Sequence, residues 1–214
     1  MAVVCPNILA DSQELYDQQI QRVAGFAHRL QIDLADGQFA KPKTVAPPAA
    51  WWPAAARVDI HLMFGRPLAA AEILVKHSPH LIIAHAEATG SFGELAVACR
   101  RVGVKVGVAL LPETAVSKIA DGLAGIDHVL IFSGSLGSFG GHANLSLLDK
   151  VKQLKGLKPE LEIGWDGGIN DQNAAQLILG GVDVLDVGGF IQQADDPAKA
   201  FAKLARIADE TGTT

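Results

Sequence analysis

Cysteine, basic charge and long apolar runs are all scarce in this chain of 214 residues. Its two cysteines, Cys5 and Cys99, lack CxxC spacing, which excludes a disulfide framework and a cysteine-rich metal site. No apolar run approaches the roughly 20 residues of a membrane span, and the N-terminus lacks a basic region followed by an apolar stretch. We therefore expect reduced cysteines, no membrane partner and a cytoplasmic location.

The balance of charge excludes another class of partner. Lys and Arg together number 18 and Asp and Glu 23, so the formal net charge is −5. A nucleic-acid-binding surface needs clustered basic residues, so we expect no nucleic-acid partner. A small anionic ligand stays compatible with this charge, because backbone N–H groups can hold a phosphate without basic side chains.

Short runs of Val, Ile and Leu recur along the chain and alternate with longer amphipathic segments. Such nearly continuous apolar runs are typical of parallel strands that are covered on both faces. The expected strands are 3–5, 29–34, 58–62, 81–85, 105–110, 128–133, 162–165 and 184–187. The expected helices are 12–28, 67–77, 91–101, 145–154, 171–179 and 197–209, with a weaker helical pattern over 47–56.

This alternation predicts an α/β fold of the (β/α)8 TIM barrel type, formed by residues 1–214 as a single domain. A doubly wound open sheet is the alternative architecture. It is disfavoured because no GxGxxG motif follows the first strand.

Polar residues stand at the ends of several expected strands. Asp33 and Asp166 close two of them, and His61 and His85 lie near the ends of two others. Carboxylates in apolar strands are costly unless they are paired, hydrogen-bonded or functional. Since the C-terminal ends of barrel strands face the active site, we expect these four residues to converge there.

Glycine pairs follow the last three expected strands. Glycine lets the backbone approach a ligand closely and point N–H groups at an anion. A phosphate site built from the loops after strands seven and eight recurs in this fold. The glycines expected at such a site are Gly140, Gly141, Gly167, Gly168, Gly188 and Gly189.

The same residues carry a resemblance to a known family. They include Pro6, Asp11, Asp33, Asp36-Gly37, His61-Leu62-Met63, His85, Glu87, Phe139-Gly140-Gly141 and Asp166-Gly167-Gly168-Ile169-Asn170. At these positions the chain resembles the ribulose-phosphate 3-epimerase family, from about Cys5 to Ala205. The runs around His61 and Asp166 are the most specific.

The resemblance implies a ribulose-phosphate-binding barrel and a divalent-metal-dependent epimerisation of D-ribulose 5-phosphate to D-xylulose 5-phosphate at C3. Inversion needs an acid and a base on opposite faces of that carbon, and Asp33 and Asp166 would be this catalytic pair. Gln31, Asp33, His61 and Asp166 would hold the ion, which we expect to be Zn²⁺, Fe²⁺ or Mn²⁺. The expected contacts to the small phosphorylated sugar are Asn7, His61, Met63, Gly140, Gly141, Gly167, Gly168, Gly188 and Gly189.

Several positions depart from the family's pattern as the resemblance presents it. Gln31 stands where the family has a histidine ligand, and an amide oxygen is the weaker ligand for a borderline ion. Asn7 replaces a substrate-contacting serine, and Ala35 and Phe132 replace methionines of the pocket. The loop over 135–141 is one residue longer before its phenylalanine.

These departures leave alternatives open. The chain could be an epimerase for another phosphoketose such as allulose 6-phosphate, or a catalytically weak phosphosugar-binding paralogue. A third alternative is a related barrel lyase, such as a keto-gulonate-phosphate decarboxylase or hexulose-phosphate synthase. The lyases carry an Asp-x-Lys-x-x-Asp motif, and here the place of its lysine is Ala35. We expect a homo-oligomer, as is common for such barrels.

The remaining polar and aromatic residues have structural interpretations. His28, His77, His80 and His128 lie near segment ends, which predicts surface positions. Trp165 precedes Asp166, so its side chain should point out of the barrel into the helical layer.

Overall fold

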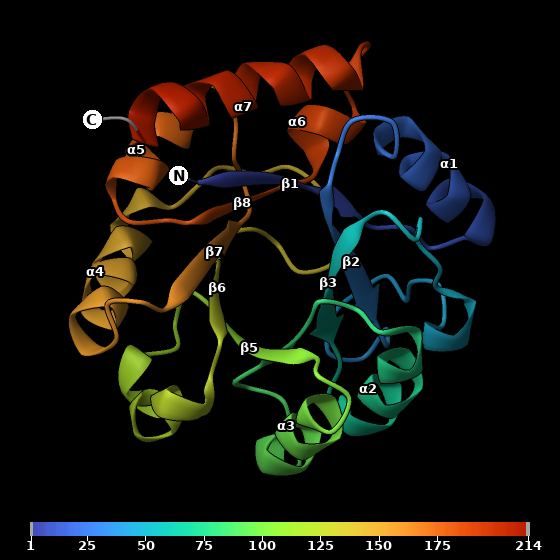
Figure 1. Ribbon diagram of the computed structural model, residues 1–214, viewed down its shortest axis with the longest axis vertical. Helices are drawn as coiled ribbons and strands as arrows, with labels where there is room; N and C mark the ends of the chain where they lie inside the picture. The colour runs from blue at the N-terminus through green and yellow to red at the C-terminus, as the bar shows by residue number, and fades with distance from the viewer. Residues whose placement is uncertain (1, 213–214) are drawn as a thin grey trace.

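The computed structural model describes residues 2–212 and shows a closed barrel of eight parallel strands (Figure 1). Each strand pairs with the next in chain order, and β8 closes against β1. The strands are β1 (Val3–Ile8), β2 (Arg29–Ala35), β3 (Arg57–Met63), β4 (Leu81–His85), β5 (Lys105–Leu110), β6 (His128–Phe132), β7 (Glu162–Asp166) and β8 (Val184–Val187). The predicted TIM barrel is therefore confirmed.

Helices surround the barrel, as Figure 1 shows. The α-helices are α1 (Gln13–Val23), α2 (Leu68–Leu74), α3 (Phe92–Arg100), α4 (Leu148–Leu157), α5 (Ala174–Leu179), α6 (Gly189–Gln192) and α7 (Pro197–Gly212). The 3-10 helices are η1 (Pro47–Ala49), η2 (Val75–His77), η3 (Val116–Lys118), η4 (Ala120–Gly125) and η5 (Leu145–Leu147). Thus β2 and β5 are each followed by 3-10 helices rather than by the regular α-helix that a full set of strand–helix units implies.

Two helix predictions were too long. The segment 47–56 forms only η1, because its prolines lack the backbone N–H that a helix needs. The helix predicted over 12–28 ends at Val23, shortly before Gly25, a residue with low helix propensity. Its start was correct, because Ser12 caps the helix by accepting a hydrogen bond from the N–H of Leu15 at 3.3 Å.

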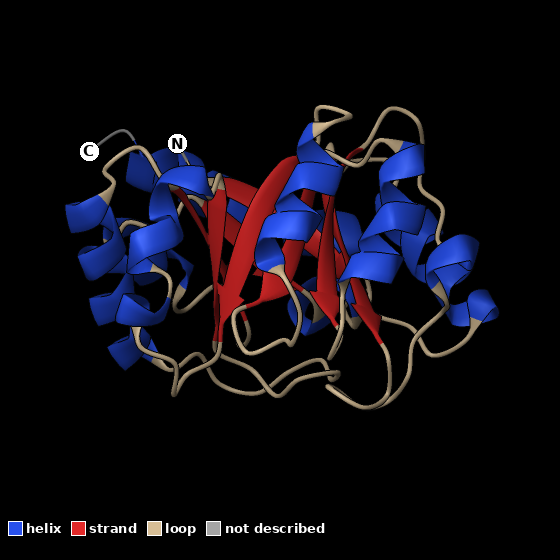
Figure 2. Ribbon diagram, turned by 90° about the horizontal axis from the view of Figure 1, so that it is seen from below, coloured by secondary structure: helices blue, strands red, loops and turns tan. Residues whose placement is uncertain are grey.

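The C-terminal ends of the strands all lie on one side of the barrel, together with the long connecting loops (Figure 2). Burial explains why the strands form here. All seven residues of β2 are buried, and β4 and β6 are also buried throughout. A parallel strand in this position is covered by helices outside and by the barrel filling inside.

The main apolar core lies between the strands and the helices. Trp165 belongs to it and is fully buried, so its predicted outward orientation is confirmed. A smaller apolar cluster consists of Leu81, Ile83, Ala109 and Leu130, which come from β4, β5 and β6. The apolar filling is therefore concentrated on one side of the barrel.

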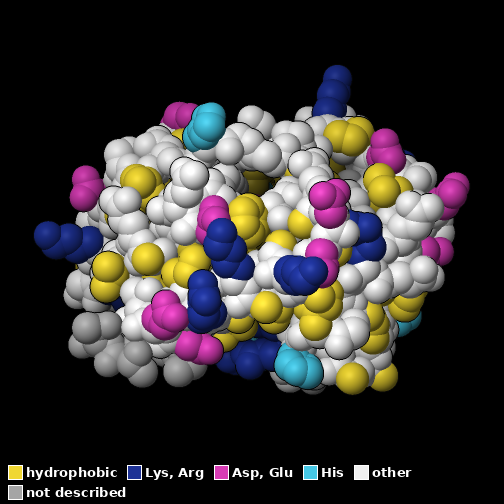
Figure 3. All heavy atoms as spheres, turned by 90° about the horizontal axis from the view of Figure 1, so that it is seen from above, with side chains coloured by type: hydrophobic (Ala, Val, Ile, Leu, Met, Phe, Trp, Pro, Cys, Tyr) yellow, Lys and Arg dark blue, Asp and Glu magenta, His cyan; other side chains and the backbone are white. Residues whose placement is uncertain are grey.

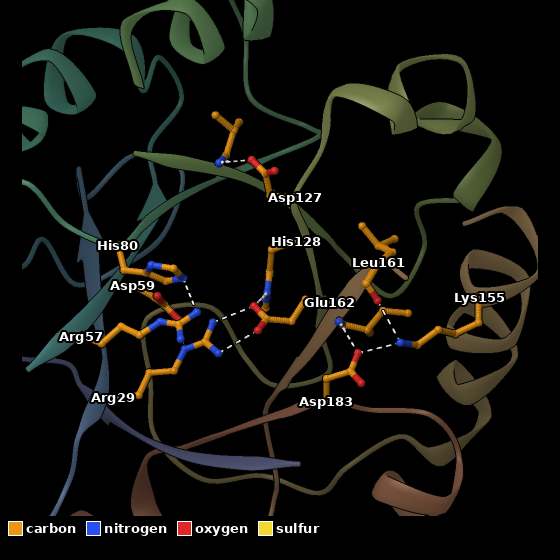
Figure 4. Close-up of polar contacts among 12 residues, drawn as sticks. Arg29, Arg57, Asp59, His80, Asp127, His128, Lys155, Leu161, Glu162 and Asp183 are labelled. Atoms are coloured by element: carbon orange, nitrogen blue, oxygen red, sulfur yellow. Dashed lines mark hydrogen bonds and ion pairs between the residues drawn. The ribbon is translucent and has the colours of Figure 1, made fainter. Parts of the chain in front are cut away.

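Charged residues join other strands at their N-terminal ends (Figure 4). The guanidinium of Arg29 donates to Asp59 at 2.6 Å and to both carboxylate oxygens of Glu162 at 2.9 and 2.7 Å. Nδ1 of His128 lies 2.8 Å from Glu162. The predicted surface position of His128 was wrong, because this contact and its inward orientation bury the ring.

The molecular surface carries charges of both signs. On the face in Figure 3, acidic and basic side chains are interspersed among apolar ones rather than segregated by sign. Among residues 2–212, no helix has the length and apolar character needed to cross a bilayer.

Candidate functional site

The predicted site residues come from neighbouring strands at the C-terminal rim of the barrel. In the pairing of β2 with β3, Asp33 lies opposite His61, and in the pairing of β1 with β2, Asn7 lies opposite Gln31. Asp166 is the last residue of β7. Parallel strand register therefore brings these side chains, distant in sequence, to one place.

A single amide bridges the two candidate catalytic carboxylates. Nε2 of Gln31 donates to Oδ1 of Asp33 at 2.9 Å and to Oδ2 of Asp166 at 2.8 Å. Asn7 donates to Oδ2 of Asp33 at 3.3 Å. Nδ1 of His61 lies 3.0 Å from Oδ1 of Asp33 and 3.8 Å from Oδ2 of Asp166. All five side chains are buried.

Burial changes the protonation of this group. It raises the pKa of Asp33 to about 7, although hydrogen bonds from Gln31 and Asn7 act in the opposite direction. Burial also raises the pKa of Asp166 to about 7, and the negative charge of Asp33 adds to this effect. The pKa of His61 falls to about 4, because burial disfavours the imidazolium form. His61 is therefore neutral at physiological pH, as a metal-ligating histidine must be.

Three of the side chains could hold a metal ion. Asp33, His61 and Asp166 each offer a ligand atom, and these atoms lie within 4.8 Å of one another. Two carboxylates and one imidazole suit a divalent ion such as Zn²⁺, Fe²⁺ or Mn²⁺. A bound cation would also lower both carboxyl pKa values, because a nearby positive charge favours the ionised form.

The group lies at the floor of a cavity of about 260 Å³. This volume is close to the lower end of ligand pockets, roughly 300–1,000 Å³. The cavity is lined by Asp33, Asp166 and the nine expected substrate contacts, namely Asn7, His61, Met63, Gly140, Gly141, Gly167, Gly168, Gly188 and Gly189. Gln31 lies beneath the floor, fully buried, and reaches the cavity through the two carboxylates.

The loops after β6, β7 and β8 approach one another closely at the cavity wall. A β-carbon on Gly168 would lie 2.1 Å from the backbone nitrogen of Ala143, and its φ of +72° also favours glycine. A β-carbon on Gly188 would lie 2.4 Å from the ring of Phe139. Close contact between the loops therefore requires glycine at both positions.

His85 does not line the cavity but lies behind His61. Nε2 of His85 is 2.8 Å from Nε2 of His61, and Nδ1 of His85 is 3.3 Å from Oε2 of Glu87. The imidazole of His85 packs between the rings of Phe39 and Phe132, with centroid separations of 4.9 and 6.1 Å. The expectation that His85 converges on the cavity was therefore only partly correct, because it contacts a floor residue from behind.

Sequence reasoning missed a third carboxylate at the cavity. Asp186 of β8 lies opposite Asp166 and lines the same cavity, and the weakly donating thiol of Cys5 is the side chain that faces it rather than an N–H or hydroxyl group. Burial and the charge of Asp166 raise its pKa well above the usual value. The signal was present in the sequence, because Asp186 interrupts an apolar strand in the same way as Asp33.

Comparisons with known proteins agree with this geometry. The model of the ribulose-phosphate 3 epimerase family matches residues 3–191. The chain belongs to the ribulose-phosphate 3-epimerase family. A ribulose-phosphate 3-epimerase of Mycobacterium tuberculosis is 31% identical over 214 residues, covering 96% of this chain and 93% of the relative. The enzyme of that name from Bacillus subtilis is 30% identical over 218 residues, covering 95% and 98%.

Solved structures show the likeness of fold more widely. KGPDC from Streptococcus mutans aligns with a TM-score of 0.76 at 13% identity, covering 99% of both chains. The 3-hexulose-6-phosphate synthase from Salmonella typhimurium aligns with a TM-score of 0.72 at 14% identity, covering 98% of this chain and 99% of that one. At sequence identities this low, the structural likeness supports a shared fold and nothing more. Membership of the ribulose-phosphate 3-epimerase family makes the chain an isomerase of the epimerase class.

The predicted departures from the epimerase family's pattern all lie in or beside the cavity. Asn7 contacts Asp33, and Phe132 lines the cavity with its ring 6.0 Å from that of His61. Ala35 packs in a small apolar cluster with Ala40 and Met63. The departures therefore line or border the cavity, while the barrel that carries it is retained.

Proposed function

We propose that this protein interconverts D-ribulose 5-phosphate and D-xylulose 5-phosphate by proton exchange at C3. One observation carries the proposal within the family: Asp33 and Asp166 share the floor of one cavity with His61. Two carboxyl groups so close together can serve as base and acid for the same carbon.

The chemistry follows from the position of C3 beside the C2 ketone. Its proton is acidic, because the electrons released on deprotonation can delocalise to give an enediolate. One carboxylate, Asp33 or Asp166, would remove this proton, and the other carboxyl group would return a proton to the opposite face. Gln31 and Asn7 orient the two groups by donating hydrogen bonds to them.

The donor set fits a divalent ion. Asp33, His61 and Asp166 would hold it, and the ion would supply electrostatic stabilisation of the charge that develops on the sugar oxygens. Gln31 would be the fourth ligand after its amide rotates by 180°. In the present orientation its Oε1 is buried without a partner, while Nε2 donates to both carboxylates. Rotation would direct Oε1 between the carboxylates, where a cation or a protonated carboxyl group would favour it.

The phosphate end of the sugar would lie against the glycine loops. Among the residues lining the cavity there is no Lys or Arg within residues 2–212, so backbone N–H groups and neutral polar side chains such as Ser138 and Asn170 would supply the donors. The nitrogen of Gly140 lies 3.6 Å from the β-carbon position of Gly189, which brings two such loops together. The carboxylates occupy the floor, so the two ends of the cavity differ in electrostatic character.

One observation favours a second candidate, a phosphosugar-binding protein with little activity. The amide of Gln31 already satisfies both carboxylates without a cation. If that state were much the more stable, the glycine cradle would still bind phosphosugars but proton transfer would be slow. Turnover and metal content distinguish the two functions.

The test is deuterium wash-in at C3, followed by NMR in D₂O with D-ribulose 5-phosphate and added Mn²⁺, Fe²⁺ or Zn²⁺. We expect metal-dependent exchange together with formation of D-xylulose 5-phosphate. Asp166→Asn should lower the exchange rate by about 10²–10⁴-fold, the usual contribution of general acid–base catalysis. Asp195→Asn is the matched control, because Asp195 is exposed and away from the cavity.

Unchanged exchange in Asp166→Asn would refute the assignment of the acid–base pair. Absence of exchange with every metal, while phosphosugar binding persists, would favour the binding protein. Exchange with allulose 6-phosphate but not with ribulose 5-phosphate would keep the chemistry and change the substrate.

A further inference from the structure

Three side chains form a hydrogen-bonded row that leads away from the cavity floor. His61 meets His85 through the two Nε2 atoms at 2.8 Å, and Nδ1 of His85 meets Oε2 of Glu87 at 3.3 Å. At the other end of the row, Nδ1 of His61 faces the candidate metal site. His85 therefore uses both of its nitrogens within the row, whereas His61 uses Nε2 within the row and Nδ1 toward the candidate metal site.

The far end of the row is held as a hydrogen-bond acceptor. The backbone N–H of Leu111 donates to Oε1 of Glu87 at 3.2 Å, and the side chain of Thr114 donates as well. Although burial acts in the opposite direction, the hydrogen bond from His85 together with these two lowers the pKa of Glu87 to about 2, so the group is an anion. Nζ of Lys150 fixes the loop by donating to the carbonyls of Leu111, Pro112 and Thr114 at 2.7, 2.8 and 2.7 Å.

An acceptor at one end dictates the proton positions along the row. The carboxylate of Glu87 cannot donate, so Nδ1 of His85 must carry the proton that joins them. A neutral imidazole has one such proton, and both rings are buried, which disfavours the imidazolium form. Nε2 of His85 must then accept from Nε2 of His61. The consequence is that Nδ1 of His61 carries a lone pair.

We propose that Glu87, acting through His85, sets the tautomer of His61 and so keeps Nδ1 of His61 free to ligate a cation. That lone pair lies 3.0 Å from Oδ1 of Asp33 and 3.8 Å from Oδ2 of Asp166, so three ligand atoms converge. Without a cation, the hydrogen bond between Asp33 and Nδ1 of His61 takes its proton from the carboxyl group of Asp33. Glu87 and His85 are thus positioning residues outside the cavity. This inference rests on the metal-dependent function proposed above.

A substitution at Glu87 separates this role from simple packing. Glu87→Gln keeps the size of the side chain but replaces one acceptor oxygen by an NH₂ donor. The N–H of Leu111 can only donate, so the amide oxygen must turn toward it and the NH₂ toward Nδ1 of His85. His85 can adapt by changing tautomer. The row then reverses, and His61 acquires a proton on Nδ1, where the cation should bind.

Two measurements test the proposal. Long-range ¹H–¹⁵N spectra of ¹⁵N-histidine protein, with signals assigned by single His→Gln variants, report the tautomers of His61 and His85 with and without Zn²⁺. Competition with a chelator reports Zn²⁺ affinity. We expect Nδ1–H on His85 and Nε2–H on His61 in the wild type, and the reverse in metal-free Glu87→Gln. Zn²⁺ affinity should fall about 10–100-fold in that variant, as for other partners of metal-ligating histidines.

Glu113→Gln is the matched control. Glu113 is exposed on the loop that contains Leu111 and Thr114, so its substitution should change neither the tautomers nor the Zn²⁺ affinity. Nδ1–H on His61 in the metal-free wild type would overturn the proposal. Unchanged tautomers and Zn²⁺ affinity in a folded Glu87→Gln would also overturn it. If Glu87→Gln did not fold, His85→Gln would serve instead, with loss of the Nε2–H tautomer of His61 and weaker Zn²⁺ binding expected.

Failure of the proposed control of the His61 tautomer can be told apart from failure of the proposed function. The tautomers and the Zn²⁺ affinity are read without substrate. If both behave as expected but C3 exchange is absent, the proposed role of Glu87 and His85 stands and the epimerase proposal fails. If exchange is metal-dependent but the tautomers differ from those expected, only the proposed role of Glu87 and His85 fails.

Discussion

Arg29 should be the most sensitive charged residue of the barrel. It is 5% exposed, while its partner Asp59 is 1% exposed and, among residues 2–212, accepts a side-chain hydrogen bond from Arg29 alone. The substitution Arg29→Met keeps most of the side-chain length and removes the charge. It leaves the carboxylate of Asp59 in the barrel interior without a counter-charge.

The expected loss follows from this burial. Removing one partner of a buried ion pair costs about 3–5 kcal/mol, because the remaining charge stays desolvated. Glu162 adds little to the loss, since it is 28% exposed and keeps its contact with His128. For a chain of this size, the midpoint of thermal unfolding should fall by roughly 6–20 °C.

The pH dependence of the effect has a definite sign. Burial raises the pKa of Asp59 even beside Arg29, and loss of Arg29 should raise it further. A carboxyl group with a raised folded-state pKa stabilises the fold below its unfolded pKa, and this contribution is lost as pH rises through the folded pKa. The defect of Arg29→Met should therefore be largest at neutral pH and shrink as the solution is acidified toward the unfolded pKa of Asp59.

Urea unfolding followed by tryptophan fluorescence at several pH values measures these effects. Arg57→Met is the control, because Arg57 pairs with Arg29 in register but is exposed, and it should change stability by less than about 0.5 kcal/mol. The double variant Arg29→Met with Asp59→Leu should recover at least half of the loss, since buried pairs can often be replaced by apolar residues. A loss below about 1 kcal/mol for Arg29→Met, or no recovery in the double variant, would refute this reasoning.

Two further predictions concern the site. Gln31→His should tighten Zn²⁺ binding by roughly tenfold or more, because imidazole is the better ligand for this ion; unchanged affinity by chelator competition would place residue 31 outside the metal site. Asp186→Asn should stabilise the metal-free protein by about 1–3 kcal/mol at neutral pH, since it removes a buried carboxylate that faces a weakly donating thiol. The folded-state pKa of Asp186 is raised by burial and by Asp166, so this gain should vanish near the unfolded pKa of about 3.9. Urea unfolding across this pH range measures it, and a gain that does not grow with pH would contradict the argument.

The barrel and the centre of its site could be predicted because their signals are local. Nearly continuous apolar runs identified β4, β5 and β6, since burial on both faces selects such runs. Asp33, His61 and Asp166 were recognisable because each interrupts or ends such a run. The topology then required them to meet, because the strands of a parallel barrel all end at the same rim.

Other features depended on partners far away in the sequence. His128 resembled a surface residue at a strand start, and only the closure of the barrel placed it beside Glu162 and within reach of Gly164, whose missing side chain leaves room for the imidazole. The sequence predicted no helix between the strands over 105–110 and 128–133, and the structure forms the short 3-10 helices η3 and η4 there.

The amino-acid sequence alone determined the kind of barrel, the family and two of the three carboxylates at the cavity, because periodicity and short motifs are properties of neighbouring residues. Only the tertiary structure decided how these groups are connected. It placed the amide of Gln31 between Asp33 and Asp166, and it placed His85 behind His61 with Glu87 beyond. Such contacts depend on strand register and on distances of 2.8–3.3 Å between side chains, which the order of residues along a strand does not contain.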